Sequence, residues 1–468
     1  MKKANFCYAV LAASAVLALG SAITSFAAAG WQTLGDEWAY VQNNGEYVKD
    51  DWKQVEGKYY YFGSDGIMLR NTLLNDNENY YYLRSSGEMI TNEWRFIQNP
   101  EWQGDELVDE GSWYYFGSNG RAYVTKDNKA YIADIAGKKY AFDQYGRMIT
   151  GWITENGEWI QEEENWSSGM YYADIEGGGS LVTNAWVYMT VPDDSNEDDT
   201  EPTYHFYFGS NGKKTVSTDK TIADKKYHFD ERGVAIYGWH QDDEDQSWKF
   251  YGDYDDPSLH TAWFQATPDA AMNQSGHDDG STYWYYASSN GKITSGEFKT
   301  IDSKTYAFNL RGELITGLKI ITTEEDNSKA LASNPASVDY IANVDEISDP
   351  NTHVFYFSSD GSLKTGTQTV TIDGSNYTFN FKSNGTPKGM GVTGPSDGYL
   401  YKNGRRLAAE DGMKYGIVEY DDKEYVVNES GSLQKKKKNI KDADGYYYCT
   451  DKDGVLIHQL NDKCEEKH

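Results

Sequence analysis

The chain has 468 residues, a formal net charge of −30 at pH 7 and 15% aromatic residues. A surface this acidic repels nucleic acid and other polyanions, and it favours cationic ligands. Only 38% of the residues are hydrophobic, which argues against a large globular core, yet 39 Tyr, 17 Phe and 14 Trp residues are too many for a disordered chain. The composition therefore predicts a thin structure with a core of aromatic rings, as in a repeat array.

Residues 1–29 are expected to be a cleaved signal peptide. Lys2 and Lys3 form a basic start, an apolar stretch follows, and small residues before positions 28 and 30 resemble cleavage sites. Because this segment carries two lysines and no acid, its removal takes the net charge from −30 to −32. No later segment is apolar enough to span a bilayer. We therefore expect a secreted protein that has no membrane contact after cleavage.

The chain then pairs aromatic residues at short spacings, beginning with GWQTLGDEWAYV at residue 30. A Gly before the second ring of a pair marks a turn, so the two rings are expected on facing strands of one hairpin. The pairs are Trp31 with Trp38, Trp52 with Tyr59, Trp152 with Trp159 and, nine residues apart rather than seven, Trp239 with Trp248.

A fifteen-residue segment occurs in three similar copies. It reads KKYAFDQYGRMITGW at 138–152, KKYHFDERGVAIYGW at 225–239 and KTYAFNLRGELITGL at 304–318. Alternating rings, a Gly turn and a second short strand predict a β-hairpin. One hairpin is marginal in water, whereas stacked copies bury each other's faces. The fold class is therefore predicted to be all-β, an elongated solenoid of stacked hairpins.

Looser copies of this hairpin cover most of the chain. Length differences fall in acidic insertions at 192–202, 241–246 and 322–328, which are interpreted as solvated loops rather than calcium sites. We expect hairpin repeats with acidic insertions over residues 30–365 and degenerate hairpin repeats over 366–468. Cys449 and Cys464 could form one disulfide in the last hairpin, because an exported chain meets an oxidising environment.

The sequence offers little for catalysis. The eight His are scattered, and H-E-x-x-H, G-x-S-x-G and Walker-type motifs are absent. We therefore predict no enzymatic activity, with no catalytic residue, no metal site and no cofactor.

The paired tryptophans are the candidate binding residues. A third ring from the next hairpin could close a three-walled aromatic box. Such a box suits a quaternary ammonium by cation–π attraction, or a sugar face by stacking, at ~0.5–2 kcal/mol per contact. The competing interpretation is that these rings are simply the core of the hairpin stack.

At these residues the sequence resembles the cell wall-binding repeats of Gram-positive bacteria, best known as choline-binding modules. The match is close over residues 30–68 and at MITGWITENGEW (148–159), and it is looser up to residue 365. The resemblance implies ligand boxes between successive repeats, with two rings from one repeat and one from the next. The boxes it implies are Trp31 and Trp38 with Tyr59 or Tyr60, and Trp152 and Trp159 with Tyr171 or Tyr172.

Two classes of function remain open at this stage. The first is a cell-wall-associated protein that binds a bacterial polymer, either a choline-decorated teichoic acid or a glycan. Similar repeats in the glucan-binding regions of extracellular glucosyltransferases keep carbohydrate among the expected ligands. The second is a structural or adhesive surface protein whose repeats are only a scaffold, and the acidic insertions favour it.

Overall fold

The computed structural model describes residues 28–99, 110–125, 127, 129–192, 202–385 and 387–460. Nearly all regular structure in these residues is antiparallel β, so the all-β hairpin prediction is confirmed. The expected signal peptide up to residue 27, most of the insertion at 192–202, and Cys464 lie outside the described residues. No helix in the described ranges is long and apolar enough to cross a membrane.

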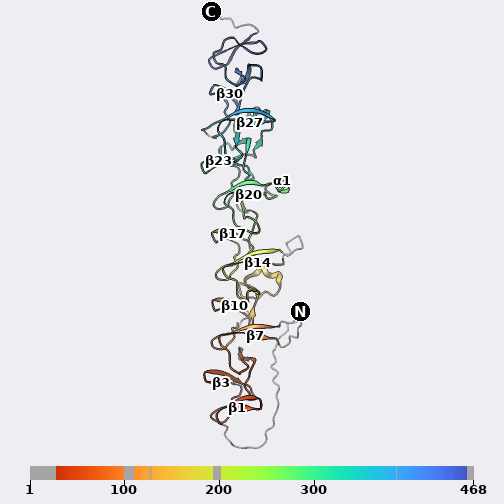
Figure 1. Cartoon of the computed structure of the whole chain (residues 1–468), viewed down its shortest axis with the longest axis vertical. Helices are drawn as coiled ribbons and strands as arrows, with labels where there is room; N and C mark the ends of the chain where they lie inside the picture. Colours follow the sequence, from red (N-terminus) through yellow and green to blue (C-terminus); the bar gives the residue numbers. More distant parts are fainter. Residues whose placement is uncertain are drawn as a thin grey trace. The chain divides into compact units, whose positions relative to one another are not determined.

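The chain forms two compact units. The first runs to Val216 and includes Glu231–Val234, and the second comprises Ser217–Asp230 and the chain from Ala235 onward. Within each unit, hairpins follow one another in chain order (Figure 1).

The first unit contains fifteen strands and the 3-10 helix η1 (Glu163–Ser168). The strands are β1 (Gly30–Leu34), β2 (Glu37–Val41), β3 (Asp51–Val55), β4 (Lys58–Phe62), β5 (Thr72–Asp76), β6 (Asn79–Leu83), β7 (Glu93–Gln98), β8 (Gly111–Phe116), β9 (Tyr131–Ile135), β10 (Lys138–Phe142), β11 (Met148–Ile149), β12 (Gly151–Thr154), β13 (Gly169–Ala173), β14 (Ala185–Thr190) and β15 (Thr203–Phe208).

The second unit contains the remaining strands and two short helices, α1 (Gln274–Asp278) and α2 (Ile341–Asp345). The strands are β16 (Thr218–Ile222), β17 (Lys225–Phe229), β18 (Trp239–Gln241), β19 (Trp248–Phe250), β20 (Ala262–Ala266), β21 (Tyr283–Ala287), β22 (Glu297–Ile301), β23 (Lys304–Phe308), β24 (Gly317–Thr322), β25 (Ala336–Ser337), β26 (Thr352–Phe357), β27 (Gly366–Ile372), β28 (Ser375–Phe381), β29 (Gly394–Ser396), β30 (Tyr399–Lys402), β31 (Arg405–Arg406), β32 (Tyr415–Tyr420), β33 (Lys423–Asn428), β34 (Ile440–Lys441), β35 (Tyr447–Thr450) and β36 (Leu456–Leu460).

Each repeat is a hairpin followed by a Gly turn, and the turn ties one hairpin to the one before it. In the second hairpin, Phe62 ends β4 and pairs across the turn with Met68. Gly66 in this turn has φ +81°, a left-handed conformation that glycine adopts without strain. The backbone N–H of Met68 then donates to the carbonyl of Trp38 in the preceding hairpin, at 2.7 Å. Stacking is therefore fixed by backbone hydrogen bonds as well as by ring packing.

The C-terminal part of the second unit has a different core. The strands β27, β28, β31, β30 and β29 form a five-stranded sheet, the largest in the described residues. No tryptophan occurs after Trp284, and the buried side chains here are mainly Phe, Val, Ile and Leu. Cys449 on β35 is disulfide-bonded. The described core thus changes from tryptophan-rich to aliphatic in this part of the chain.

Candidate ligand-binding boxes

Three aromatic rings meet at the first hairpin interface. Trp31 on β1 and Trp38 on β2 approach edge to face, with centroids 6.1 Å apart and planes at 90°. Tyr60, from β4 of the next hairpin, lies 4.8 Å from Trp31 at 82°. The structure thus brings Trp31, Trp38 and Tyr60 together. Tyr59 faces elsewhere, since alternate residues of a strand point to opposite sides, and it is exposed.

The same arrangement occurs twice in the second unit. Trp239 and Trp248 lie 6.3 Å apart at 83°, and Tyr285 from the next described hairpin lies 4.8 Å from Trp239. Trp263 and Trp284 lie 6.4 Å apart at 80°, with Tyr306 at 4.9 Å from Trp263. We call each set a box, with a first, a second and a third ring in the order Trp, Trp, Tyr.

A fourth residue forms the floor of each box. Met68, Ile293 and Leu314 pack in the same clusters as the first rings of their boxes. The backbone N–H of each floor residue donates to the carbonyl of the second ring's residue, at 2.7 Å to Trp38, 2.9 Å to Trp248 and 2.9 Å to Trp284. The floor hydrogen bond therefore positions the second ring against the next hairpin.

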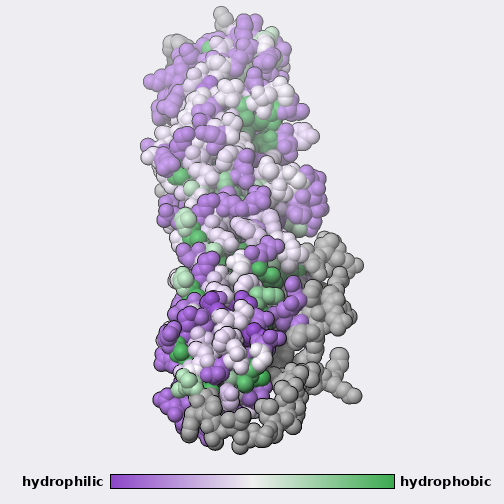
Figure 2. Space-filling model, turned by 60° about the horizontal axis from the view of Figure 1, so that its bottom comes forward, coloured by the Kyte–Doolittle hydropathy of each residue, from purple (hydrophilic) through white to green (hydrophobic). Residues whose placement is uncertain are grey.

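The boxes are open on the side of the second ring. Trp38 and Trp284 are 42% and 45% exposed, whereas Tyr285 is fully buried and Tyr306 nearly so. A cavity of about 310 Å³ is lined by Trp248, Met272 and Ile293 among others. Figure 2 shows that the visible face is mostly hydrophilic, with hydrophobic residues in small separate patches.

The rings are neutral at physiological pH. Burial raises the pKa of the Tyr60 and Tyr285 hydroxyls above the usual value near 10. These side chains therefore present neutral π surfaces within the boxes rather than phenolate charges.

At Trp152 the structure assembles a box from different residues than the spacing suggests. Trp166 of η1 lies 6.5 Å from Trp152, and Phe206 of β15 lies 5.5 Å from it at 76°. Tyr172 packs on Trp152 at 5.0 Å, but it belongs to the partner strand β13 of the same hairpin. Tyr171 pairs with Ile153 on that strand.

Trp159, the expected partner of Trp152, lies apart from this box. It forms an isolated bridge with Ile153, and its ring N–H donates to the carbonyl of Thr150 at 2.9 Å. The side chain is 41% exposed and borders a cavity of about 260 Å³ together with Tyr145. Because Trp159 pairs with Ile153, its side chain lies on the Ile153 face of β12, and Trp152 points to the opposite face.

Further tryptophans hold the first-ring position, Trp52 and Trp94 among them, and the second-ring position of Trp94 is held by the exposed Trp113. Trp52 packs on Tyr61 and on Tyr81 of the next hairpin, and Trp94 packs on Tyr115 and Tyr140. Tyr59 holds the second-ring position relative to Trp52, because its carbonyl accepts the N–H of Met89 at 2.9 Å. In the predicted pair of Trp52 and Tyr59, a tyrosine thus holds the position that a tryptophan holds in the other pairs.

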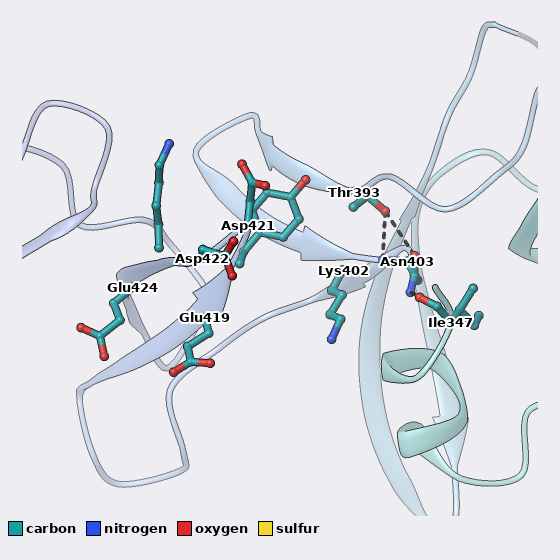
Figure 3. Close-up of a pocket in the computed structure, with 10 residues that line it drawn as sticks. Ile347, Thr393, Lys402, Asn403, Glu419, Asp421, Asp422 and Glu424 are labelled. Atoms are coloured by element: carbon teal, nitrogen blue, oxygen red, sulfur yellow. Dashed lines mark hydrogen bonds between the residues drawn. The ribbon is translucent and has the colours of Figure 1, made fainter. Parts of the chain in front are cut away.

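Another cavity is of a different kind. It measures about 550 Å³ and is lined by acidic and basic side chains, among them Lys402, Glu419, Asp421, Asp422 and Glu424. Figure 3 shows these carboxylates spread along the β32–β33 hairpin. In the same view the Thr393 hydroxyl donates a hydrogen bond to the side-chain oxygen of Asn403. Within the described ranges, no three His, Cys, Asp or Glu side chains come close enough to hold a metal ion.

A fixed spacing between tryptophans missed the Trp263–Trp284 pair and Trp166. The pair is separated in sequence by an insertion that contains α1. The second ring can instead be found from the strand pairing. It lies two residues before the residue that pairs with the first ring. Examples are Trp38 with Tyr40, Trp248 with Phe250 and Trp284 with Tyr286. Trp166 carries no such signal, because it comes from a 3-10 helix.

Residues 50–94 match the choline-binding repeat family, and residues 108–122 match a cell wall binding repeat family. Glucosyltransferase-S of Streptococcus mutans serotype c is 25% identical over 60% of this chain and 16% of its own length. Glucosyltransferase-I of Streptococcus downei is 23% identical over 78% of this chain and 24% of its own length. The aligned chain thus spans less than a quarter of either relative.

Solved structures of similar proteins include CbpJ of Streptococcus pneumoniae TIGR4, at 20% identity and a TM-score of 0.40, covering 73% of this chain and 99% of that one. The structure of CbpF in complex with ipratropium gives 19% identity and a TM-score of 0.37, covering 78% of this chain and 98% of that one.

Proposed function

Because this chain carries choline-binding and cell wall-binding repeats, we propose that it is a secreted, non-catalytic protein that attaches to a bacterial cell-wall polymer through its aromatic boxes. The ligand in each box is a quaternary ammonium group such as choline. This assignment rests on the chemistry of the boxes, and the polymer that best fits it is a choline-decorated teichoic acid.

The observation that supports this proposal most is the repetition of one ring geometry. In the boxes led by Trp31, Trp239 and Trp263, the first two rings lie 6.1–6.4 Å apart and the third lies 4.8–4.9 Å from the first. The connection between the first two rings varies from a short turn to a loop with a helix. Packing alone tolerates many side chains, so a constant Trp–Trp–Tyr set favours a ligand requirement.

The charge of the molecule favours a cationic ligand. At −30, the protein attracts a trimethylammonium group over long range and repels anionic polymers that lack one. A single box that gains ~4 kcal/mol binds at millimolar strength. Several boxes that face a repetitive polymer raise the avidity by ~10²-fold or more.

The test removes the second ring from each of the three boxes. Trp38→Ala, Trp248→Ala and Trp284→Ala in one chain should weaken retention on choline-containing cell walls by at least ~10-fold, since each ring contributes ~0.5–2 kcal/mol. Free choline should elute the wild-type protein, whereas a soluble glucan should not. Retention is measured by sedimentation with purified walls.

Trp159→Ala is the matched control, because Trp159 is as exposed as Trp38 but stands outside every box described. It should leave retention unchanged. If the triple variant is folded and is retained as well as wild type, the boxes are not the attachment sites.

Binding to glucan is the second candidate function. The similarity to two streptococcal glucosyltransferases favours it, and exposed tryptophans also stack on sugar rings. The same elution experiment separates the candidates, since release by glucan and not by choline would replace the first proposal with the second.

A further inference from the structure

Lys214 occupies the floor position of the box at Trp152. The turn that carries it, FGSNGKK at 208–214, corresponds residue for residue to FGSDGIM at 62–68, where the last residue is Met68. Phe208 pairs with Lys214 as Phe62 pairs with Met68. In the other described turns with this pairing the corresponding residue is uncharged: Tyr47, Met68, Met89, Ala122, Met148, Trp159, Ala235, Ile293, Leu314, Leu363, Leu433 and Leu456.

The ammonium group of Lys214 lies inside the ring cluster. Its Nζ atom is 4.9 Å from the ring centroid of Trp152, 5.5 Å from that of Trp166 and 5.6 Å from that of Phe206. It also donates to the carbonyl of Ser167 at 3.1 Å, and the residue is only 3% exposed. All three rings are within the distance of about 6 Å at which a cation is attracted to an aromatic face.

Burial of a lysine ammonium is costly unless the lost water contacts are replaced. Here three ring faces and one carbonyl oxygen surround the charge. Lys214 reaches this position because its backbone N–H donates to the carbonyl of Met170 at 2.7 Å, the same kind of bond that holds Met68. The side chain is thus aimed into the box by the floor hydrogen bond.

A second cation lies close to the same rings. The Arg232 guanidinium is 5.7 Å from the Trp166 centroid and 5.3 Å from that of Tyr204. An external cation would have to displace Lys214 and approach against the charge of Arg232. The box at Trp152 is therefore closed to the ligand that the open boxes suit.

We propose that Lys214 is an internal ligand that permanently fills the box of Trp152, Trp166 and Phe206, and that replacement of Lys214 by methionine opens this box as an additional quaternary ammonium site. The second half of the proposal rests on the proposed function. The first half does not, since it concerns only where the lysine ammonium lies.

The first experiment tests the location of the ammonium in the full-length wild-type protein. Reductive methylation followed by peptide mass spectrometry compares Lys214 with the adjacent Lys213, whose side chain is 38% exposed. Lys214 should react at least ~10-fold more slowly than Lys213, because its amine is held against three rings. In Trp166→Leu, which removes one wall, the Lys214 rate should rise toward that of Lys213. Equal rates in the wild type would overturn the internal-ligand assignment.

The second experiment counts binding sites. Equilibrium dialysis with radiolabelled choline should show one more bound choline per chain in Lys214→Met than in the wild type. Lys214→Arg, which keeps a cation on the floor, should show no gain. The methionine variant should fold, because methionine holds this position below Trp31.

The two experiments separate the two hypotheses. A wild type that binds choline and a Lys214→Met variant with no extra site would overturn the additional-site claim alone. If neither protein binds choline, the proposed function and the additional site both fail, while the methylation rates still decide where the Lys214 ammonium lies.

Discussion

At the scale of single residues, the box at Trp152 depends on a glycine with an ordinary backbone conformation. Gly169 follows η1, and its N–H donates to the carbonyl of Trp166. A Cβ atom at Gly169 would lie 2.6 Å from Cε3 of Trp152 and 3.0 Å from the carbonyl oxygen of Trp166. Gly169 is thus required by close packing between the helix turn and the first ring, and not by backbone strain.

Gly169→Ala should therefore displace Trp152 and destabilise the first unit by about 1–3 kcal/mol, as overpacking does. Chemical unfolding followed by tryptophan fluorescence measures the change. Gly63→Ala is the control, because the nearest atom to its added Cβ is a flexible Asp65 carboxylate oxygen at 3.1 Å. Similar stabilities of the two variants would contradict the packing argument.

At the scale of elements, each box combines two rings of one hairpin with a third ring from a following hairpin. The β18–β19 hairpin illustrates how tightly the ladders pack, since Phe250 of β19 stacks on Phe264 of β20 at 5.2 Å and 7°. His260 lies against both of these rings, at 5.2 Å and 5.1 Å. Desolvation at this half-buried position lowers the pKa of His260, and the nearby Asp256 and Asp253 carboxylates only partly oppose that shift.

This lowered pKa predicts a loss of stability in mild acid. Because the unfolded chain binds the His260 proton more readily, stability is full above the unfolded pKa of about 6.5. It falls as the pH decreases from there to the folded pKa. An NMR titration of the His260 ring should give a midpoint below 6.5, and His260→Gln should reduce the pH dependence of the melting temperature. A midpoint at or above 6.5 would contradict the desolvation argument.

The sequence predicts the ring pairs correctly where both rings lie on the paired strands of one hairpin. Trp31 with Trp38 and Trp239 with Trp248 are predicted as pairs, and the structure brings each pair together because the two rings lie on the paired strands of one hairpin. Trp159 meets the same spacing but pairs with Ile153 on the edge of β12 that faces away from β13. A fixed sequence spacing predicts which residues face each other only where the strand register is regular. An insertion or a bulge changes the register, and the prediction then fails.

The identity of the third ring followed the same logic. Tyr60 and not Tyr59 contacts Trp31, because only one of two successive strand residues faces the preceding hairpin. The β12–β13 ladder contains a bulge after Ile153, so Met170 occupies the second-ring position and Trp166 supplies the ring from outside the strand. No periodic pattern in the sequence encodes that substitution.

At the scale of the whole molecule, the boxes end before the C-terminal third of the chain. Trp263 is the last tryptophan that leads a described box. The sheets that follow it pack aliphatic residues and phenylalanines. The domain division at residue 365 and the elongated solenoid stay predictions. The net charge of −30 acts on all boxes together, since it sets the field through which a quaternary ammonium group approaches.

Attachment should therefore depend on salt in a specific way. An increase in ionic strength from 0.01 M to 0.15 M shortens the Debye length from about 30 Å to about 8 Å. On a choline-coated sensor surface, the association rate should fall, while the dissociation rate, which the ring contacts control, should change little. A salt effect confined to dissociation would show that the global charge does not guide the approach.

The floor residue of a box determines whether that box can accept an external cation. Under the proposal made for Lys214, one substitution at this position, lysine to methionine, converts an occupied box into a vacant one. A cation tethered to the backbone competes at an effective concentration that no free ligand reaches. The valence of the chain can thus be set turn by turn, and because avidity multiplies across sites, one such change would alter attachment far more than it alters the fold.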